Sequence, residues 1–191
     1  MVPVLHVQLD REYTARLGLR TSPLALRRYF VIFRSMNETT DSLTAGTGVS
    51  LREITSETLY SILKLKVKPD QEQFVANNSN SIAEAYFEPK AWFRAIYSGE
   101  TPVGFLMLFD NPDEPEYYLW RFMIDSRYQR MGYGRQALNL LIEHVRTRPN
   151  ARELSTSYSP GEGSPEPFYE RLGFVNTGEV VDDENVMKLI L

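Results

Sequence analysis

The chain has 191 residues, of which 42% are hydrophobic, enough for one domain with a substantial core. It contains no cysteine and two histidines, His6 and His144, so disulfides, thiolate nucleophiles and cysteine-based zinc sites are excluded, and no metal centre is expected. Residues 48–191 carry 15 basic and 21 acidic side chains, a net charge of −6. This charge argues against nucleic acid and suits a cationic small molecule, although acidity that only aids solubility is the plainer explanation.

The first 47 residues differ from the rest of the chain. They show weak hydrophobic periodicity and end in a polar tract, residues 37–48, that is typical of a linker. We expect residues 1–47 to be a poorly ordered extension or to precede the true start, for which Met36 is a candidate, and residues 48–191 to form the domain. The sequence has no run of about eighteen apolar residues and no clear signal peptide, so a cytoplasmic location is the default expectation.

From residue 48 onward, strand and helix patterns are interspersed. Strands are predicted at residues 49–54, 92–97, 103–109, 117–124, 152–157, 174–180 and 185–190. Helices are predicted at residues 57–65, with Ser56 as N-cap, and at residues 81–87, 133–147 and 165–172. Strands clustered with helices on either side predict an α/β fold with a mixed sheet.

The strand predicted at residues 117–124 leads into a glycine turn, Gln129-x-x-Gly132-x-Gly134. Apolar residues then recur at i, i+3, i+4 and i+7 from Leu138, which predicts a helix with one buried face. At such a turn the first N–H groups of the helix have no partner, and glycine lets a bulky anion approach the backbone. The turn therefore predicts a phosphate or pyrophosphate site.

Other kinds of glycine turn fit the sequence less well. A Walker loop requires Gly-Lys-Ser/Thr, but this chain continues Gly134-Arg135-Gln136. A Rossmann fingerprint requires three glycines in an early βαβ unit, and only two occur here, late in the chain. An ordinary tight turn, in which glycine only relieves backbone strain, stays open on the turn alone.

The residues beyond the helix carry a specific resemblance. About thirty-five residues after the turn comes Phe168-Tyr169-Glu-Arg-Leu-Gly173-Phe174, and the combination resembles the GNAT superfamily of acetyl-CoA-dependent N-acetyltransferases. Further blocks within residues 48–191 are similar to bacterial spermine/spermidine (diamine) acetyltransferases: Leu51-Arg-Glu-Ile-Thr, Phe74-Val-Ala-Asn-Asn, Ser81-Ile-Ala-Glu-Ala-Tyr86, Val103-Gly-Phe, Arg121-Phe-Met-Ile-Asp125 and Val186-Met-Lys-Leu. The resemblance implies a GNAT-like mixed, mostly antiparallel sheet flanked by helices on both faces.

The resemblance also implies which residues bind acetyl-CoA, the expected co-substrate. Backbone groups of Phe122, Met123 and Ile124 would line the pantetheine and the acetyl carbonyl. Tyr169, four residues before Gly173, would protonate the departing thiolate, since a phenol with a pKa near 10 is protonated at pH 7. The pyrophosphate would meet the residues of the glycine turn, which are Gln129, Arg130, Met131, Gly132, Tyr133, Gly134 and Arg135.

The amine side follows less directly from the resemblance. Some relatives place a Glu just before the apolar triplet of the strand, where this chain has Trp120 and Arg121, so the general base stays open. Glu84 and Tyr86 are predicted to contact the substrate. The acidic loop at residues 113–116 is a second predicted anchor, because exposed carboxylates attract ammonium groups.

We therefore expect an enzyme that transfers an acetyl group from acetyl-CoA to a primary amine, above all a polyamine such as spermidine or spermine, by direct attack in a ternary complex. The alternatives are acetylation of another amine, such as a peptide N-terminus or an aminoglycoside, and a non-catalytic acyl-CoA-binding sensor. The sensor is kept because relatives commonly have Asn and Ala where this chain has Glu162 and Pro165, close to Tyr169. The expected partner is a small-molecule amine, without nucleic acid or membrane, and a homodimer is one option for the assembly.

Overall fold

The computed structural model describes residues 43–44 and 48–191. Most of the predicted extension therefore lies outside the described residues, and a domain boundary at residue 48 stays a prediction. Inside the tract predicted as a linker, Leu43–Thr44 form a two-residue strand, β1, which pairs with Leu51 and Ser50. None of the described helices is long and apolar enough to cross a membrane.

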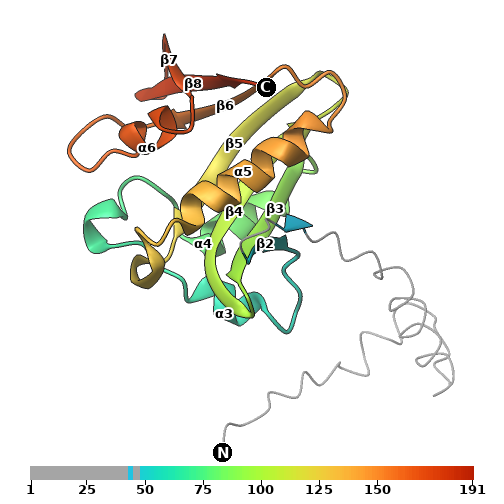
Figure 1. Cartoon of the computed structure of the whole chain (residues 1–191), viewed down its shortest axis with the longest axis vertical. Helices are drawn as coiled ribbons and strands as arrows, with labels where there is room; N and C mark the ends of the chain where they lie inside the picture. Colours follow the sequence, from blue (N-terminus) through green and yellow to red (C-terminus); the bar gives the residue numbers. More distant parts are fainter. Residues whose placement is uncertain (1–42, 45–47) are drawn as a thin grey trace, which may run out of the picture. The chain divides into compact units, whose positions relative to one another are not determined.

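Eight strands form one sheet with the order β1-β2-β3-β4-β5-β6-β8-β7 (Figure 1). After β1 they are β2 (Val49–Arg52), β3 (Ala91–Ser98), β4 (Thr101–Asn111), β5 (Glu116–Ile124), β6 (Glu153–Tyr158), β7 (Val175–Val181) and β8 (Glu184–Ile190). Neighbouring strands are antiparallel, except β5 and β6, which are parallel. The predicted mixed, mostly antiparallel sheet is confirmed.

Helices cover both faces of this sheet. They are α3 (Leu59–Leu63), α4 (Asn78–Ala85), α5 (Tyr133–Arg146) and α6 (Glu166–Glu170), with short 3-10 helices η1 (Pro69–Gln71) and η2 (Ser126–Tyr128). The buried face of α5 packs against Leu106 and Leu108 of β4, while the neighbouring Phe105 and Met107 pack in a second cluster with Ile62 of α3. Because successive strand residues point to opposite faces, α5 and α3 cover different sides of the sheet.

Two helices begin two or more residues away from their predicted starts, and α6 begins one residue later than predicted. Thr58, not Ser56, is the N-cap of α3. The Thr58 hydroxyl accepts the N–H of Thr55 at 2.9 Å, in the turn before the helix, and caps no N–H of α3 itself. The helix predicted from residue 81 begins three residues earlier, because the Asn77 side chain accepts the N–H of Asn80 at 2.9 Å and caps it there. A side-chain cap therefore sets the start of α4, whereas α3 begins without one.

The two edges of β5 are paired to very different extents. One edge pairs with β4 from Glu116 to Ile124, interrupted by a bulge that leaves Trp120 without an opposite residue. The other edge pairs with β6 only at Tyr118 and Leu119. Beyond Leu119 the two parallel strands diverge, while the opposite edge of β6 pairs along its whole length with β8. The sheet is therefore open along the second half of β5.

Candidate active site

A cavity of about 1000 Å³ occupies the place where β5 and β6 diverge. Its walls come from four segments, within residues 67–76, 118–124, 128–135 and 156–171, and from Glu184 at the start of β8. Nine of the predicted site residues line it: Phe122, Met123, Ile124, Gln129, Arg130, Gly132, Gly134, Arg135 and Tyr169. The structure thus brings the apolar triplet, the glycine turn and the tyrosine to one site.

The open edge of β5 forms one wall of this cavity. The Thr156 hydroxyl donates to the Leu119 carbonyl at 3.1 Å, at the last residue of β5 that β6 still reaches. Phe122, Met123 and Ile124 follow, and no strand of the described residues pairs with them on that side; all three line the cavity. Backbone amides at an open strand edge can pair with an extended amide chain, as a neighbouring strand would. The pantetheine arm of CoA is such a chain, so the open edge fits it.

The glycine turn forms the second wall. Arg130 and Gly132 both have left-handed backbone conformations, with φ of 63° and 82°, and Gly132 is the N-cap of α5. Within the described residues, the backbone N–H groups from Arg130 to Arg135 donate to no protein acceptor, and the first hydrogen bond of α5 runs from Gln136 to the Gly132 carbonyl at 3.2 Å. Free N–H groups at a helix N-terminus favour an anion, and the Arg130 and Arg135 side chains add positive charge. The turn fits a pyrophosphate.

The two positions of the turn require glycine for different physical reasons. Position 132 requires glycine because its φ is positive. Crowding is not the reason, since a Cβ there would meet only the Gln136 side chain, at 3.7 Å. Gly134 has ordinary helical geometry, but a Cβ would lie 3.4 Å from the rings of Phe122 and Phe168. The predicted reason, room for the anion alone, is therefore incomplete.

The Gln129 side chain connects the glycine turn to two neighbouring segments. Its side-chain amide donates to the Gln71 side-chain oxygen at 2.7 Å and to the Ile124 carbonyl at 3.0 Å. The amide thus ties the turn both to the end of β5 and to η1. Met131 is 57% exposed, Tyr133 packs against the core beneath α5, and neither side chain lines the cavity.

Asp125 holds the junction between β5 and the turn. It is buried, and its carboxylate accepts the Arg127 guanidinium at 2.8 Å and the backbone N–H groups of Arg127 and Lys66 at 3.0 Å. Burial alone would raise the pKa of Asp125, but these hydrogen bonds and the charge of Arg127 outweigh it and hold the pKa below its usual value. The carboxylate is therefore charged at neutral pH and fixes the exit of β5.

Tyr169 lies in α6, against the wall formed by β6. It is 6% exposed, and its ring packs between those of Phe168 and Phe174, each with a centroid 5.6 Å away. Burial raises the pKa of Tyr169 to about 12, although a hydrogen bond with Thr156 acts in the opposite direction. The phenol is therefore protonated over the whole physiological range, as a proton donor requires.

Neither unusual residue near Tyr169 disturbs its helix. Pro165 is the N-cap of α6, and its carbonyl accepts the N–H groups of Phe168 at 2.9 Å and Tyr169 at 3.2 Å. Proline is tolerated at the start of a helix because its missing N–H would have no partner there. Glu162 is exposed and does not line the cavity.

The predicted substrate residues lie outside the cavity lining. Glu84 accepts the Arg121 guanidinium at 3.0 Å, so its charge is already paired. Tyr86 is 83% exposed and packs edge-on against Phe87. Two other carboxylates do line the cavity, Glu72 and Glu184. They are the acidic groups that an amine in this cavity would meet.

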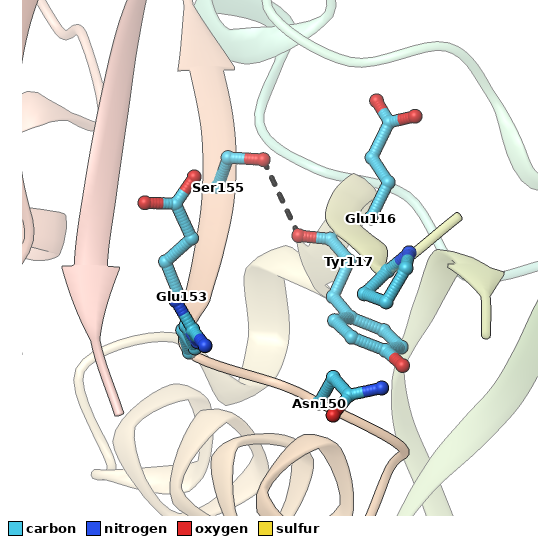
Figure 2. A pocket seen from close by; sticks show the side chains of 7 residues that line it. Glu116, Tyr117, Asn150, Glu153 and Ser155 are labelled. Atoms are coloured by element: carbon cyan, nitrogen blue, oxygen red, sulfur yellow. Dashed lines mark hydrogen bonds between the residues drawn. The ribbon is translucent and has the colours of Figure 1, made fainter. Parts of the chain in front are cut away.

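The acidic loop lies at the other end of β5. Glu116 lines a second cavity of about 450 Å³, and Figure 2 shows it with Tyr117, Asn150 and Glu153 around that cavity. The Tyr117 hydroxyl donates to the Pro149 carbonyl at 2.6 Å, just beyond the C-terminal end of α5, whereas the glycine turn lies at its N-terminal end. The loop and the open edge lie at opposite ends of β5, so the loop is not placed to anchor an amine at the open edge.

Some residues of the site were not predicted. Tyr118 and Ser157 line the cavity and share a hydrogen bond of 2.6 Å, and Glu184 comes from a strand that begins some sixty residues after β5 ends. Residues 71–76, which also line the cavity, carry no signal in the sequence beyond a family-like block. The spacing of polar residues along the sequence does not reveal these contacts, because they depend on where two strands separate.

The chain resembles known acetyltransferases in sequence and in fold. The model of the acetyltransferase (GNAT) family matches residues 50–174. The chain is 29% identical over 150 residues to spermine/spermidine N(1)-acetyltransferase of Bacillus subtilis (strain 168), a match that covers 73% of this chain and 96% of that protein.

Solved structures agree on the fold. RimL, a ribosomal L7/L12 alpha-N-protein acetyltransferase in complex with coenzyme A, superposes with a TM-score of 0.64 and 16% identity, covering 79% of this chain and 98% of that one. An acetyltransferase from Thermus thermophilus gives a TM-score of 0.60 and 16% identity, covering 78% and 99%. The family match spans the sheet from β2, the glycine turn and Tyr169. The chain therefore belongs to the acetyltransferase (GNAT) family and is an acetyl-CoA-dependent N-acetyltransferase.

Proposed function

We propose that this enzyme acetylates a primary amine of a polyamine, such as spermidine or spermine, by direct attack on acetyl-CoA in a ternary complex. The observation that carries the acetyl-transfer chemistry is one shared cavity. It is lined by an open strand edge, by a glycine turn whose N–H groups donate to no acceptor among the described residues, and by a buried tyrosine. The polyamine preference is supported by the spermine/spermidine acetyltransferase that is 29% identical over most of its length.

The residues of the cavity divide the chemistry between them. The N–H groups from Arg130 to Arg135 bind the pyrophosphate, and the open edge of β5 at residues 122–124 binds the pantetheine. A backbone N–H of that edge stabilises the carbonyl oxygen as negative charge develops on it. Tyr169 donates its proton to the thiolate that leaves, whose basicity is similar to that of a phenol. Acetyl-CoA itself supplies the activated acyl group.

Glu72 is the proposed anchor for the part of the amine that does not react. It lines the cavity from residues 71–76 and makes no ion pair with another described residue. A polyamine carries several ammonium groups along an alkyl chain, so a carboxylate at a distance from the reacting nitrogen favours it over a monoamine. The predicted substrate contacts of Glu84 and Tyr86 stay predictions, as do a cytoplasmic location and a homodimer.

The test is thiol release from acetyl-CoA by the full chain with a panel of amines: spermidine, spermine, a simple monoamine, an aminoglycoside and a peptide with a free N-terminus. We expect spermidine or spermine to give the highest kcat/KM, with the acetylated amine identified by mass. A peptide or an aminoglycoside at the top of the panel would replace the polyamine. Tight CoA binding without thiol release for any amine would favour the sensor.

A charge-neutral variant separates anchoring from catalysis. Glu72→Gln should raise KM for spermidine more than for the monoamine, and raised salt should reduce the difference, because exposed charges are screened over about 8 Å at physiological salt. Glu114→Gln, in the hairpin at the other end of β5, is the matched control and should change neither KM. Equal effects of Glu72→Gln on both amines would remove Glu72 as an anchor.

A further inference from the structure

A chain of hydrogen bonds runs along the cavity at the point where β5 and β6 separate. The Tyr118 hydroxyl of β5 lies 2.6 Å from the Ser157 hydroxyl of β6, and Ser157 donates to the Glu184 carboxylate at the start of β8. Ser159 donates to the other oxygen of the same carboxylate at 3.3 Å. Tyr118, Ser157 and Glu184 all line the cavity that holds Tyr169.

The direction of this chain follows from the number of protons. A serine hydroxyl has one proton, and that of Ser157 is given to Glu184. The Tyr118 hydroxyl must therefore donate to Ser157, which leaves the lone pairs of the Tyr118 oxygen free to accept a proton from the cavity. The carboxylate at the far end is half-buried, so it can exchange protons with water. The three groups are ordered for proton movement away from the cavity.

We propose that Tyr118, Ser157 and Glu184 form a proton relay that serves as the general base of the reaction. This inference rests on the proposed amine acetylation. It assigns the role that Trp120 and Arg121 cannot take at the position where some relatives carry a glutamate, since the Arg121 guanidinium is a cation bound to Glu84. It also places base and acid on different groups of the same cavity, with Tyr169 held apart as the donor to the thiolate.

The proton balance is complete. The substrate nitrogen arrives as an ammonium and gives one proton to the Tyr118 oxygen, and the lone pair that this frees attacks the acetyl carbon. In the same movement the Tyr118 proton passes to Ser157, and the Ser157 proton passes to Glu184, which releases it to water. A neutral tyrosine and serine are restored. As the C–S bond breaks, Tyr169 gives its proton to the thiolate, the nitrogen releases its second proton to water, and water reprotonates Tyr169. The products are the amide, the thiol and one released proton.

The surroundings keep Tyr118 neutral between these transfers. Burial raises the pKa of Tyr118, the hydrogen bond with Ser157 lowers it, the charge of Glu184 raises it and the charge of Arg121 lowers it, with a net rise. The Tyr169 phenol also interacts electrostatically with Tyr118 and Glu184. Tyr118 therefore conducts a proton without becoming a stable anion at neutral pH.

The test compares kcat against pH for the full-length wild type and for Glu184→Gln, with spermidine as acceptor. We expect Glu184→Gln to lower kcat at pH 7 by about 10²-fold, within the usual range for a lost general base. The loss should shrink as pH rises toward the amine pKa near 10, because the amine then loses its proton to water unaided. Ser157→Ala should give the same profile, and it guards against a folding defect that is specific to one variant.

Two controls distinguish a relay from a structural role. Ser159→Ala removes the other hydroxyl on the same carboxylate but lies outside the relay, so it should keep the wild-type pH profile. A primary amine whose ammonium pKa lies well below 7 needs no base, so Glu184→Gln should hardly affect its turnover. Equal losses for this amine and for spermidine would assign Glu184 a structural role and overturn the relay.

The remaining outcomes are also decisive. A wild-type pH profile in both Glu184→Gln and Ser157→Ala, in an active enzyme, would overturn the relay and leave the proposed function intact. A wild type that releases no thiol with any amine would overturn the proposed function, and the relay with it.

Discussion

The two edges of β5 show how one strand serves both stability and function. Along the β4 edge the ladder runs from Asn111↔Glu116 to Gly104↔Ile124, and Asn111 and Ile124 are buried. Along the β6 edge only Tyr118 and Leu119 pair with β6, and the edge beyond Leu119 opens into the cavity. The closed edge fixes where the backbone of residues 122–124 lies, and the open edge leaves it available to a ligand.

The largest expected effect belongs to the open side. Tyr169→Phe removes one hydroxyl and almost no volume, so CoA affinity by calorimetry should persist while kcat falls by about 10²–10⁴-fold. The high pKa of Tyr169 also has a pH consequence. The folded-state pKa, about 12, lies above the unfolded value near 10, so the stability that this group contributes is complete below pH 10 and is lost as pH rises toward 12. Wild-type turnover in Tyr169→Phe would give the acid role to water or to another residue.

The next prediction compares a glycine on each edge. A Cβ at Gly104 would lie 2.4 Å from the Met123 carbonyl oxygen, on the closed edge, so Gly104→Ala must move the backbone and should cost about 1–3 kcal/mol of unfolding free energy. A Cβ at Gly134 would lie 3.4 Å from two aromatic rings that border the open cavity, so Gly134→Ala should cost less. Denaturant unfolding of the two variants checks the order, and equal losses would contradict the difference between the edges.

A smaller effect is expected at the turn. Gly132→Ala places an alanine at a φ of 82°, which costs about 1–2 kcal/mol or forces the turn to rearrange. Gly178 in β7 has a φ of 79° and open space around it, so Gly178→Ala suffers the same strain away from the cavity. Both variants should lose similar stability, and only Gly132→Ala should weaken CoA binding. Equal CoA affinity for both would separate the turn from the cofactor.

The smallest effect concerns Asp125 at the exit of β5. Because its folded-state pKa is depressed, the carboxylate contributes stability that is present above the unfolded value near 4 and is lost as pH falls through the folded value. Below pH 4 the wild type should therefore lose stability with falling pH more steeply than Asp125→Asn. Parallel curves for the two proteins would mean that the hydrogen bonds of Asp125 do not depend on its charge.

Much of the fold could be predicted from the sequence, because it rests on local patterns. The helix predicted at residues 133–147 is α5 at Tyr133–Arg146, since its apolar residues follow the helical period. The predicted strands lie within two residues of their observed ends. The glycine turn is predicted from its spacing and from the helix that follows it, whereas the roles of the apolar triplet and Tyr169 are implied by the resemblance to the GNAT superfamily.

The amine side could not be predicted in this way. The prediction of Glu84 rests on a short sequence block, but Arg121 of β5 reaches this carboxylate across the fold. The relay joins β5, β6 and β8, and it exists only because the pairing of β5 with β6 stops at Leu119. The point at which two parallel strands separate depends on the packing of the whole sheet, and no local pattern records it.

The central claim is that the free N–H groups of the turn and the open edge of β5 form the cofactor cradle, and hydrogen exchange tests it directly. Exchange of the full chain should be measured with and without saturating CoA. We predict that CoA slows exchange at residues 130–135 and at residues 122–124, while the closed ladder between β3 and β4 changes little. Unchanged exchange at residues 130–135 under saturating CoA would contradict the claim and place the pyrophosphate elsewhere.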